Sequence, residues 1–597
     1  MDFRNVKLTN GFWKHMEDLN SSVTIDAVWN RFEETGRIDA FKFDWHEGME
    51  NKPHFFWDSD VVKWMEGACY IMCREERPDL REKVEMLIER IEEHQEESGY
   101  FNIYFTVCEP DKRFSNRDWH ELYCAGHLFE AAVAYYYATG SDRLVKIATK
   151  YADFIEKVFM IDKAAPFMTP GHEEIELALI KLYKVTGTER YLKLAEFFLK
   201  NRAKNDKDTM LFNVPEYAQD YEPVEEMTSA VGHAVRCMYL LCGMVDCAKH
   251  TDNKEMLESC KRVYDDIVSS KMYITGGLGA TYHAEAFSVP YDLPNETAYA
   301  ETCAAIGFMF FADRMCKYTR EAKYADSVER AMYNGMCSGI SLSGDAFFYE
   351  NPLEINLANR KRVSVRVGIE RLPITQRKKV FDCSCCPPNL NRVLSSMGGY
   401  IYDIDGAVGY VNQFADSVLS CGEAEIVQKT NYPWDGRVSI TAKGLDTLYI
   451  RIPAWCKNFS LNKDYTISNG YAVVKNDGEE IVFDMDIKPV IINSRPEVVT
   501  NVGKAAVMRG PIVYCAEAVD NCENLHSLVL TNTDGAIESY SDEFHGIILE
   551  LNGLKLISST ELYSELPPTS ENVKIKLIPY YGFANRGENS MLVWLNR

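Results

Sequence analysis

Residues 128–140, with the sequence LFEAAVAYYYATG, form the stretch that decides the fold. Residues 128–137 have the pattern of a helix, and Thr139-Gly140 supplies the turn that ends it. A second helical pattern follows this turn and runs to Phe159. The stretch therefore predicts a helical hairpin.

The same unit recurs along the chain. Further hairpins are predicted at residues 177–199, 235–267 and 304–333. Their turns recur roughly 47 to 68 residues apart, a spacing typical of arrays of paired helices. Such an array closes into an α/α barrel or continues as an open solenoid. Long connecting loops that carry Trp, His and Glu favour a closed barrel with a site at one end.

After about residue 400 the apolar pattern changes from a helical period to an alternating one. Residues 447–452 and 481–487 alternate as half-buried strands do. Asn476-Asp477-Gly478, just before the second run, predicts a hairpin turn. Arg509-Gly510-Pro511 marks a boundary, and the strand pattern continues beyond it. This part of the chain predicts two β-sandwich modules.

Size and charge restrict the function. A chain of 597 residues is expected to form several domains. The formal charge of -24 argues against nucleic acid or an anionic membrane as a partner, whereas a neutral sugar remains compatible. No export signal or run of 18 apolar residues is recognised. With eighteen cysteines, we expect a cytoplasmic protein with free thiols.

A cysteine cluster stands at Cys383-Ser384-Cys385-Cys386-Pro387-Pro388-Asn389. The two prolines predict a stiff, kinked loop rather than a regular helix. Clustered thiolates favour zinc or another soft metal. The usual C-x-x-C spacing is missing, so a disulfide or a buried apolar trio remain alternatives, although a reducing compartment argues against the disulfide.

Three histidines stand near the starts of predicted helices: His120, His172 and His233. A single such histidine is usually structural. Three of them at equivalent positions of successive hairpins point to one pocket, because equivalent helix ends of a barrel converge. His127 is expected to be structural.

Two acidic residues complete the candidate site. Glu285 follows a glycine-rich stretch that lacks the ending of a phosphate-binding loop. Glu301 and Cys303, two positions apart, cannot share a helix face, so both reach a metal only where the chain enters its helix. With the cysteine cluster they could complete a tetrahedral zinc site. The alternative for Cys303 is a core cysteine.

Six motifs occur in a characteristic order: His120 to His127 (HELYCAGH), Pro170 to Glu174 (PGHEE), Gly232 to Arg236 (GHAVR), Asp292 to Asn295 (DLPN), Glu301 to Cys303 (ETC) and Cys385 to Asn389 (CCPPN). Together with residues 451–455 (RIPAW), this set resembles glycoside hydrolase family 127, the β-L-arabinofuranosidases. The resemblance covers most of the chain.

The resemblance implies a multidomain α+β fold. An N-terminal catalytic (α/α)6 barrel at residues 6–400 is expected to precede two jelly-roll-like β-sandwich domains, at residues 401–505 and 506–597. Residues 1–5 are expected to join the first sandwich. A homodimer is also expected.

The resemblance also assigns roles to residues. It implies a Zn2+ ion held by Glu301, Cys303, Cys385 and Cys386. It implies Cys385 as the nucleophile and Glu285 as the general acid/base, whose pKa we expect to be raised by a low-dielectric pocket. The residues expected to bind the sugar are His120, His172, His233 and Tyr349.

The expected function is a zinc-dependent retaining exo-glycosidase that releases L-arabinose from non-reducing terminal β-L-arabinofuranosides of small glycosides or oligosaccharides. Phe55, Phe56 and Trp57 offer a sugar platform or pack in the core. Alternatives are another sugar within the family, a sugar epimerase or isomerase on the same barrel, which needs no thiols, and a carbohydrate-binding protein with structural zinc. A two-carboxylate glycosidase using Glu285 and Glu301 is a mechanistic variant.

Overall fold

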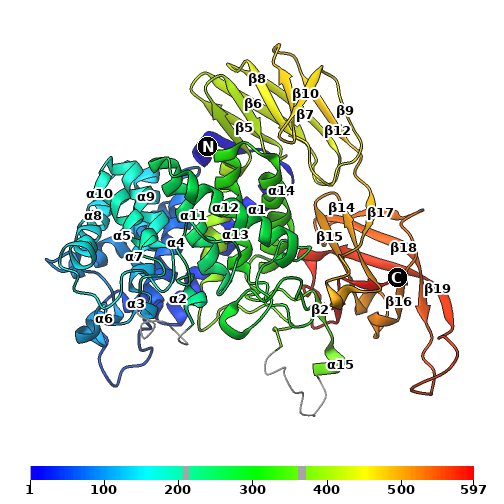
Figure 1. Ribbon diagram of the computed structural model, residues 1–597, viewed down its shortest axis with the longest axis horizontal. Coiled ribbons are helices and arrows are strands. Elements are labelled where there is room, and N and C mark those ends of the chain that lie inside the picture. The colour runs from blue at the N-terminus through cyan, green and yellow to red at the C-terminus, as the bar shows by residue number, and fades with distance from the viewer. Residues whose placement is uncertain (1, 206–213, 361–371) are drawn as a thin grey trace.

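The computed structural model describes residues 2–205, 214–360 and 372–597. Paired helices occupy the first two thirds of the chain (Figure 1). Six of them, the inner helices, are buried over most of their length: α4 (Trp57–Met72), α7 (Glu121–Thr139), α9 (Ile175–Thr186), α11 (Ala234–Thr251), α13 (Thr302–Thr319) and α16 (Cys386–Ser395). Each inner helix contacts the next, and α16 closes the ring against α4.

Outer helices bury one amphipathic face against the inner ring. They are α2 (Ile25–Glu34), α5 (Pro78–His94), α8 (Arg143–Glu156), α10 (Glu189–Lys200), α12 (Lys254–Asp266) and α14 (Ala322–Arg330). Helix α8 pairs with α7, α10 with α9, α12 with α11 and α14 with α13, so the four predicted hairpins are present. Further helices are α1 (Gly11–Leu19), α3 (Arg37–Ala40), α6 (Tyr104–Val107) and α15 (Leu357–Arg360).

Glycines allow the inner helices to approach closely. A Cβ atom on Gly67 of α4 would lie 3.0 Å from the Cβ of Asn391 on α16. A Cβ atom on Gly126 of α7 would lie 2.7 Å from Glu174, just before α9. Since contacts this short exclude a side chain, these positions fix the helix spacing.

Two sheets follow the helices. A six-stranded sheet has the order β1 (Val6–Leu8), β5 (Ser417–Cys421), β6 (Ala424–Thr430), β7 (Arg437–Lys443), β12 (Ile481–Met485) and β9 (Phe459–Leu461). A five-stranded sheet has the order β10 (Tyr465–Ser468), β11 (Tyr471–Lys475), β8 (Thr447–Arg451), β4 (Val408–Val411) and β3 (Tyr402–Asp405). A Cβ on Gly409 of β4 would lie 3.1 Å from Ile426 of β6, so the two sheets face each other.

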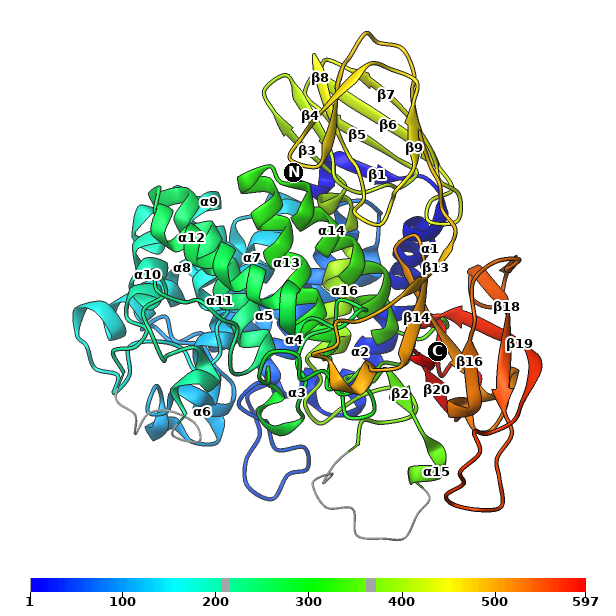
Figure 2. The same ribbon diagram turned by 45° about the vertical axis from the view of Figure 1, so that its right-hand side comes forward.

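Strand β1 comes from the start of the chain and pairs antiparallel with β5, with Val6 opposite Leu419. We expected residues 1–5 to join this module, and the residues that pair are 6–8. The first residues of the chain therefore lie beside a segment that follows the whole helical region (Figure 2).

The predicted hairpin turn at Asn476-Asp477-Gly478 is wrong. Strands β11 and β12 on either side of it belong to different sheets. The Asn476 side chain donates hydrogen bonds to the carbonyls of Ala442 (3.2 Å) and Leu445 (2.7 Å). These bonds hold the turn against the β7–β8 connection, and the chain crosses from one sheet to the other instead of reversing within one.

A third sheet contains the C-terminal part of the chain. Its order is β13 (Pro489–Ile492), β14 (Lys504–Arg509), β21 (Leu595–Asn596), β16 (Leu528–Leu530), β18 (Gly546–Leu556), β19 (Ser570–Pro579), β15 (Ile512–Glu517), β20 (Met591–Leu592) and β2 (Glu354–Ile355), with β17 (Ile537–Ser541) paired to β18. The expected boundary between residues 505 and 506 falls inside β14, and Arg509 pairs with Ile512 across a hairpin turn. The marker Arg509-Gly510-Pro511 is therefore a turn within this sheet.

Both β regions flank the helical region (Figures 1 and 2). Strand β2 lies between α14 and α16 in the sequence, yet it pairs with β20, so the helical region contributes an edge to the third sheet. Among residues 2–205, 214–360 and 372–597, no helix is long and apolar enough to cross a membrane.

Candidate active site

A cavity of about 270 Å³ lies where the starts of the inner helices meet. Eight residues that the sequence predicted for the site line it: His120, His172, His233, Glu285, Glu301, Cys303, Tyr349 and Cys385. Cys386 lies behind them, fully buried, and contacts the other two cysteines. The volume lies just below the range of about 300–1,000 Å³ that is typical of small-molecule sites.

Helix starts explain this convergence. His120 is the N-cap of α7, and His233 is the N-cap of α11. Glu301 is the N-cap of α13, and Cys385 is the N-cap of α16. Since the positive end of a helix dipole favours negative charge, these ends suit a carboxylate and a thiolate.

The cysteine cluster is not a loop over its whole length, because its second half forms the start of helix α16. Cys386 is the first residue of α16, and Pro387 and Pro388 stand in its first turn. Proline is tolerated there because the first N–H groups of a helix have no partner within it. The chain before Cys383 is fixed by buried Arg37, whose Nη2 donates to the carbonyls of Phe381 (3.1 Å) and Asp382 (2.8 Å).

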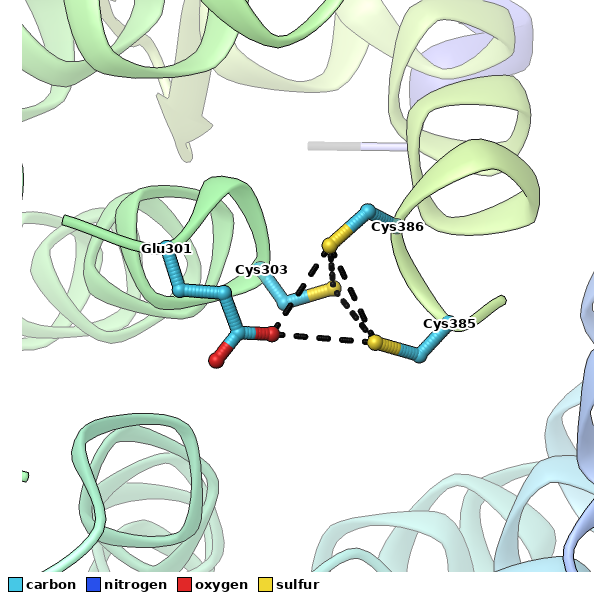
Figure 3. Close-up of side chains that lie close together, drawn as sticks. All are labelled: Glu301, Cys303, Cys385 and Cys386. Carbon is cyan, nitrogen blue, oxygen red and sulfur yellow. Dashed lines mark hydrogen bonds between the residues drawn. The ribbon is translucent and has the colours of Figure 1, made fainter. Parts of the chain in front are cut away.

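Four side chains form a tetrahedral set (Figure 3). The Sγ atoms of Cys303 and Cys385 lie 3.6 Å apart, those of Cys303 and Cys386 3.3 Å, and those of Cys385 and Cys386 3.8 Å. Glu301 Oε1 lies 3.6 Å from Cys385 Sγ and 3.7 Å from Cys386 Sγ. Four ligands at about 2.3 Å from a central zinc would stand about 3.8 Å apart, so the set fits a tetrahedral metal.

Burial supports the same interpretation. Glu301 is 1% exposed, and its Oε2 has no hydrogen-bond partner. Burial and the neighbouring Cys385 raise the pKa of Glu301 well above its usual value. A buried carboxylate among three thiols is unfavourable unless a cation compensates it. Within this set Cys385 alone is only partly buried, so it is the most exposed of the three cysteines.

The histidines are held in defined tautomers. His120 Nδ1 lies 2.7 Å from the carbonyl of Asp118, and His172 Nδ1 lies 2.9 Å from the carbonyl of Glu173. A carbonyl can only accept, so each Nδ1 carries the proton and each Nε2 is an acceptor. Burial, and then the charge of Arg236, lower the pKa of His120 to about 3 and that of His172 well below its usual value.

His233 has the opposite tautomer. Its Nδ1 accepts from the backbone N–H groups of Val235 (3.2 Å) and Arg236 (3.4 Å). The proton therefore lies on Nε2, which is 3.1 Å from Glu285 Oε2 and donates to it.

The expected raised pKa of Glu285 is not found. Burial does raise it, but the hydrogen bond from His233 and the charge of Arg236 bring the pKa below its usual value. A hydrogen bond to the charged form of a carboxyl stabilises that form. The donor His233, rather than a dry pocket, therefore sets the protonation of Glu285.

Tyr349 contacts the candidate nucleophile. Its hydroxyl lies 3.2 Å from Cys385 Sγ and 3.9 Å from Cys383 Sγ. Burial, and then the nearby Cys383 and Cys385, raise the pKa of Tyr349 well above its usual value. Tyr349 is therefore a neutral phenol beside the sulfur.

Sequence reasoning missed several residues of the cavity wall. Tyr123, Tyr217 and Arg236 line it, and Lys63 Nζ donates to the Tyr123 hydroxyl at 2.8 Å. Arg236 follows His233 by one helical turn, a spacing that could have identified it. Of the expected platform, Phe55 and Phe56 line the cavity, whereas the Trp57 ring packs against Arg37 with the guanidinium 5.0 Å from the ring centre.

The chain matches three family models. Residues 5–399 match the β-L-arabinofuranosidase GH127 catalytic domain, residues 409–486 the GH127 middle domain and residues 489–596 the family's C-terminal domain. A non-reducing end β-L-arabinofuranosidase of Bifidobacterium longum subsp. longum is 32% identical over 667 residues, which cover 99% of this chain and 100% of the relative.

Solved structures of GH127 enzymes also match this chain over almost its whole length. A GH127 β-L-arabinofuranosidase from Geobacillus stearothermophilus T6 is 37% identical, with a TM-score of 0.91 and 99% of each chain covered. Another solved GH127 β-arabinofuranosidase is 32% identical, with a TM-score of 0.88, and the match covers 100% of this chain and 97% of the other. The chain therefore belongs to glycoside hydrolase family 127 and is a glycoside hydrolase.

Proposed function

We propose that this enzyme is a zinc-dependent retaining exo-glycosidase that releases L-arabinose from non-reducing terminal β-L-arabinofuranosides. The observation that carries the proposal is the tetrahedral set of Glu301, Cys303, Cys385 and Cys386, with Cys385 open to a small cavity. Likeness over the whole chain to β-L-arabinofuranosidases supports this substrate.

We propose that the closed ring of inner helices and its outer layer form an (α/α)6 barrel. The facing six- and five-stranded sheets would form one β-sandwich module, completed by β1, and residues from β13 onward a second. The site would then lie at one end of the barrel.

The small cavity supports recognition of one terminal sugar. His120 and His172 present Nε2 acceptors, and the Tyr349 hydroxyl can donate or accept. Sugar hydroxyls need both kinds of partner, and neutral imidazoles supply acceptors without charge. Phe55 and Phe56 add apolar surface to the wall of the same cavity.

The four ligand side chains would hold zinc, and a zinc ion keeps bound thiols deprotonated at neutral pH. Cys385 would remain a thiolate that can attack the anomeric carbon. Tyr349, 3.2 Å from this sulfur, would hold it in position with a hydrogen bond.

Two steps complete the reaction. Cys385 Sγ forms a bond to the anomeric carbon as the bond to the leaving oxygen breaks, and Glu285 gives its proton to that oxygen. Water then attacks the same carbon, the Glu285 carboxylate takes a proton from it, and Cys385 leaves as a thiolate. A bound sugar would remove water from Glu285, whose side chain is 35% exposed, and desolvation favours the protonated form that the first step needs.

The test is hydrolysis of p-nitrophenyl β-L-arabinofuranoside by the wild type, Glu285→Gln and Cys385→Ser. We expect Cys385→Ser to lose at least about 10⁴-fold in kcat, because the nucleophile is removed. We expect Glu285→Gln to lose about 10²–10⁴-fold, as general acids do. Turnover is measured at 405 nm.

Zinc content, measured on each protein sample, is the control. Glu285→Gln should keep the metal of the wild type, since Glu285 is not one of the four ligands. A wild type that is inactive on this glycoside, although zinc is bound, would contradict the proposed sugar.

A two-carboxylate mechanism is the second candidate, because oxygens of Glu285 and Glu301 lie within 4.8 Å of each other. Retaining glycosidases place two carboxyl groups about 5–5.5 Å apart. In that mechanism Cys385→Ser keeps substantial turnover when the metal is retained. The same variant therefore separates the two candidates.

We propose a cytoplasmic location on the basis of the thiols. All eighteen cysteines are free, and no pair of them forms a disulfide. Free thiols in this number suit a reducing compartment, where small imported glycosides would be the substrates. Cell fractionation that finds most of the activity outside the cell would contradict this location.

A further inference from the structure

The three histidines of the cavity come from three separate parts of the chain. Their rings follow one another along one wall: His120 and His172 lie 5.5 Å apart between ring centres, and His172 and His233 5.6 Å. His120 and His172 lie in segments outside regular helices, just before α7 and α9. These two segments share a hydrogen bond from the Gly171 N–H to the carbonyl of Arg117 (3.2 Å), but a further group is needed to join both of them to α11.

Arg236 lies where the three segments meet. Its Nη1 donates to the carbonyl of Gly171, next to His172, and lies 3.3 Å from Asp118 Oδ1, two residues before His120. Its Nη2 donates to the Tyr217 hydroxyl at 3.0 Å. Its own backbone N–H donates to His233 Nδ1.

Asp118, which accepts a hydrogen bond from Arg236, also fixes the tautomer of His120. The carbonyl of Asp118 accepts the Nδ1 proton of His120, while the carboxylate of Asp118 accepts from Arg236. A shift of Asp118 would therefore displace the carbonyl that accepts the Nδ1 proton of His120. One planar guanidinium serves all these acceptors, which the single ammonium of lysine cannot do in the same geometry.

The packing leaves little freedom for adjustment. Arg236 is 3% exposed, and its guanidinium lies over the Tyr217 ring at 4.2 Å. A Cβ atom on Gly171 would lie 2.6 Å from the carbonyl oxygen of Arg117 and 2.7 Å from Asp118 Oδ1. The segments of His120 and His172 thus touch at Gly171, and Arg236 bonds to both at this contact.

We propose that Arg236 is the positioning residue of the histidine wall, and that its guanidinium sets the orientation of the three imidazoles that receive the sugar. The sugar is the one of the proposed function, on which this inference rests. Arg236 acts through the histidines and not as a reacting group.

The test uses Arg236→Lys in the full-length zinc-loaded enzyme, with Arg314→Lys as the matched control. Arg314 pairs with the single carboxylate of Asp246 at 2.9 Å and does not line the cavity. We expect kcat/KM of Arg236→Lys to fall about 100-fold, since displacements of about 1 Å at a site have this effect. Arg314→Lys should change kcat/KM by no more than about threefold, because its side chain does not line the cavity and its charge is kept.

A second measurement follows the imidazoles themselves. In protein labelled with ¹⁵N-histidine, NMR should show His120 and His172 protonated at Nδ1 and His233 at Nε2. Arg236→Lys should give mixed tautomers or broadened signals for these three, with the other histidines unchanged, and Arg314→Lys should match the wild type.

Two results would overturn the proposal. One is an Arg236→Lys enzyme with wild-type kcat/KM. The other is a large fall in kcat/KM with unchanged imidazole signals, which would mean that Arg236 acts on the sugar directly. If the wild type does not cleave the arabinofuranoside, the proposed function fails, but the imidazole signals still decide the role of Arg236.

Discussion

Neutral histidines in buried positions are the main feature at the scale of single residues. His120, His172 and His233 all have a lowered pKa, with burial as the largest cause. Their protons are placed by backbone partners, so the cavity offers fixed acceptors and one fixed donor to Glu285. Keeping these rings neutral costs stability in acid, where the unfolded chain takes up protons that the folded chain excludes.

We predict that this cost is measurable for His120. Its pKa is about 3 when folded, against 6.5 for an ordinary histidine, so stability falls as the pH decreases from about 6.5 towards 3. At pH 5 the loss from this residue is about 2 kcal/mol. Urea unfolding of the wild type and His120→Gln at pH 7.5 and pH 5 should show a pH-dependent loss smaller by this amount in the variant. An equal loss in both proteins would contradict the prediction.

The metal-binding residues could be predicted from the sequence, because cysteine and glutamate side chains are themselves typical metal ligands. Cysteines and Glu301 indicated a tetrahedral set, and the structure brings these four side chains together. The sequence could not predict that His233 donates to Glu285, because this contact joins residues 52 positions apart through the fold. The spacing from His233 could have placed Arg236 at the cavity, but its bonds to Gly171 and Asp118 join separate segments and leave no local pattern.

Helix α16 is the element on which the cysteines depend. It begins with Cys386 and carries Arg392, which is 3% exposed. Arg392 Nη1 lies 2.9 Å from Glu66 on α4 and also bonds to Glu130 on α7. Buried ion pairs of this kind fix the position of the helix in the ring, since either partner alone would be an uncompensated charge.

We predict that Arg392→Met lowers the free energy of unfolding by about 3–5 kcal/mol, because Glu66 and Glu130 lose their buried cationic partner and keep only the more exposed Lys181. It should also weaken zinc retention, because α16 carries Cys386 and starts at Cys385. Thermal unfolding and zinc release to a chelator measure the two effects.

Arg451→Met is the control for this prediction. It also breaks a buried ion pair, with Glu329, but neither β8 nor α14 carries one of the four ligands. It should destabilise the protein without faster zinc release. If both variants release zinc at the same rate, Arg392 has no specific effect on the ligands.

At the scale of elements, the sequence predicted the helical hairpins but not every connection. The helical period of the apolar residues and the turn residues are local signals, so the hairpins from α7 to α14 could be predicted. Asn476-Asp477-Gly478 has the local chemistry of a hairpin, yet strand pairing depends on distant partners, and β12 pairs with β7 and β9. Likewise, two prolines after Cys386 mark the first turn of a helix and not only a loop.

For the whole molecule, buried charge also joins the β regions to the helices. Arg451 of β8 is fully buried and lies 2.6 Å from Asp326 and 2.6 Å from Glu329, both on α14. Trp455 and Tyr432 also donate to Glu329, at 3.1 and 2.5 Å. This cluster ties the middle β module to the helical region.

We predict that Arg451→Met lowers the free energy of unfolding by about 3–5 kcal/mol, since Glu329 would be left buried without its partner. Limited proteolysis should then cleave between the helices and the middle module. Lys443→Met is the control, because its pair with Glu425 is exposed and such pairs contribute about 0–1 kcal/mol. Equal stability of the two variants would contradict this role of Arg451.

The division of the chain into a helical and a strand-rich part could be predicted because the apolar period changes near residue 400. The limits between modules could not be predicted in the same way. Strand β2 leaves the helical region for the third sheet, and β13 and β14 both belong to that sheet. Such exchanges depend on pairing in space and leave no local mark in the sequence.

The pairing of β1 with β5 has a consequence for synthesis on the ribosome. The partner of Val6 is Leu419, so the strand that receives the first residues emerges roughly 400 residues later, about 20 to 80 s at usual rates of translation. During this time Val6 and Leu8, buried in the finished protein, have no partner strand. An unpaired strand of a nascent chain is exposed to wrong partners, and chaperones that bind it early would protect it.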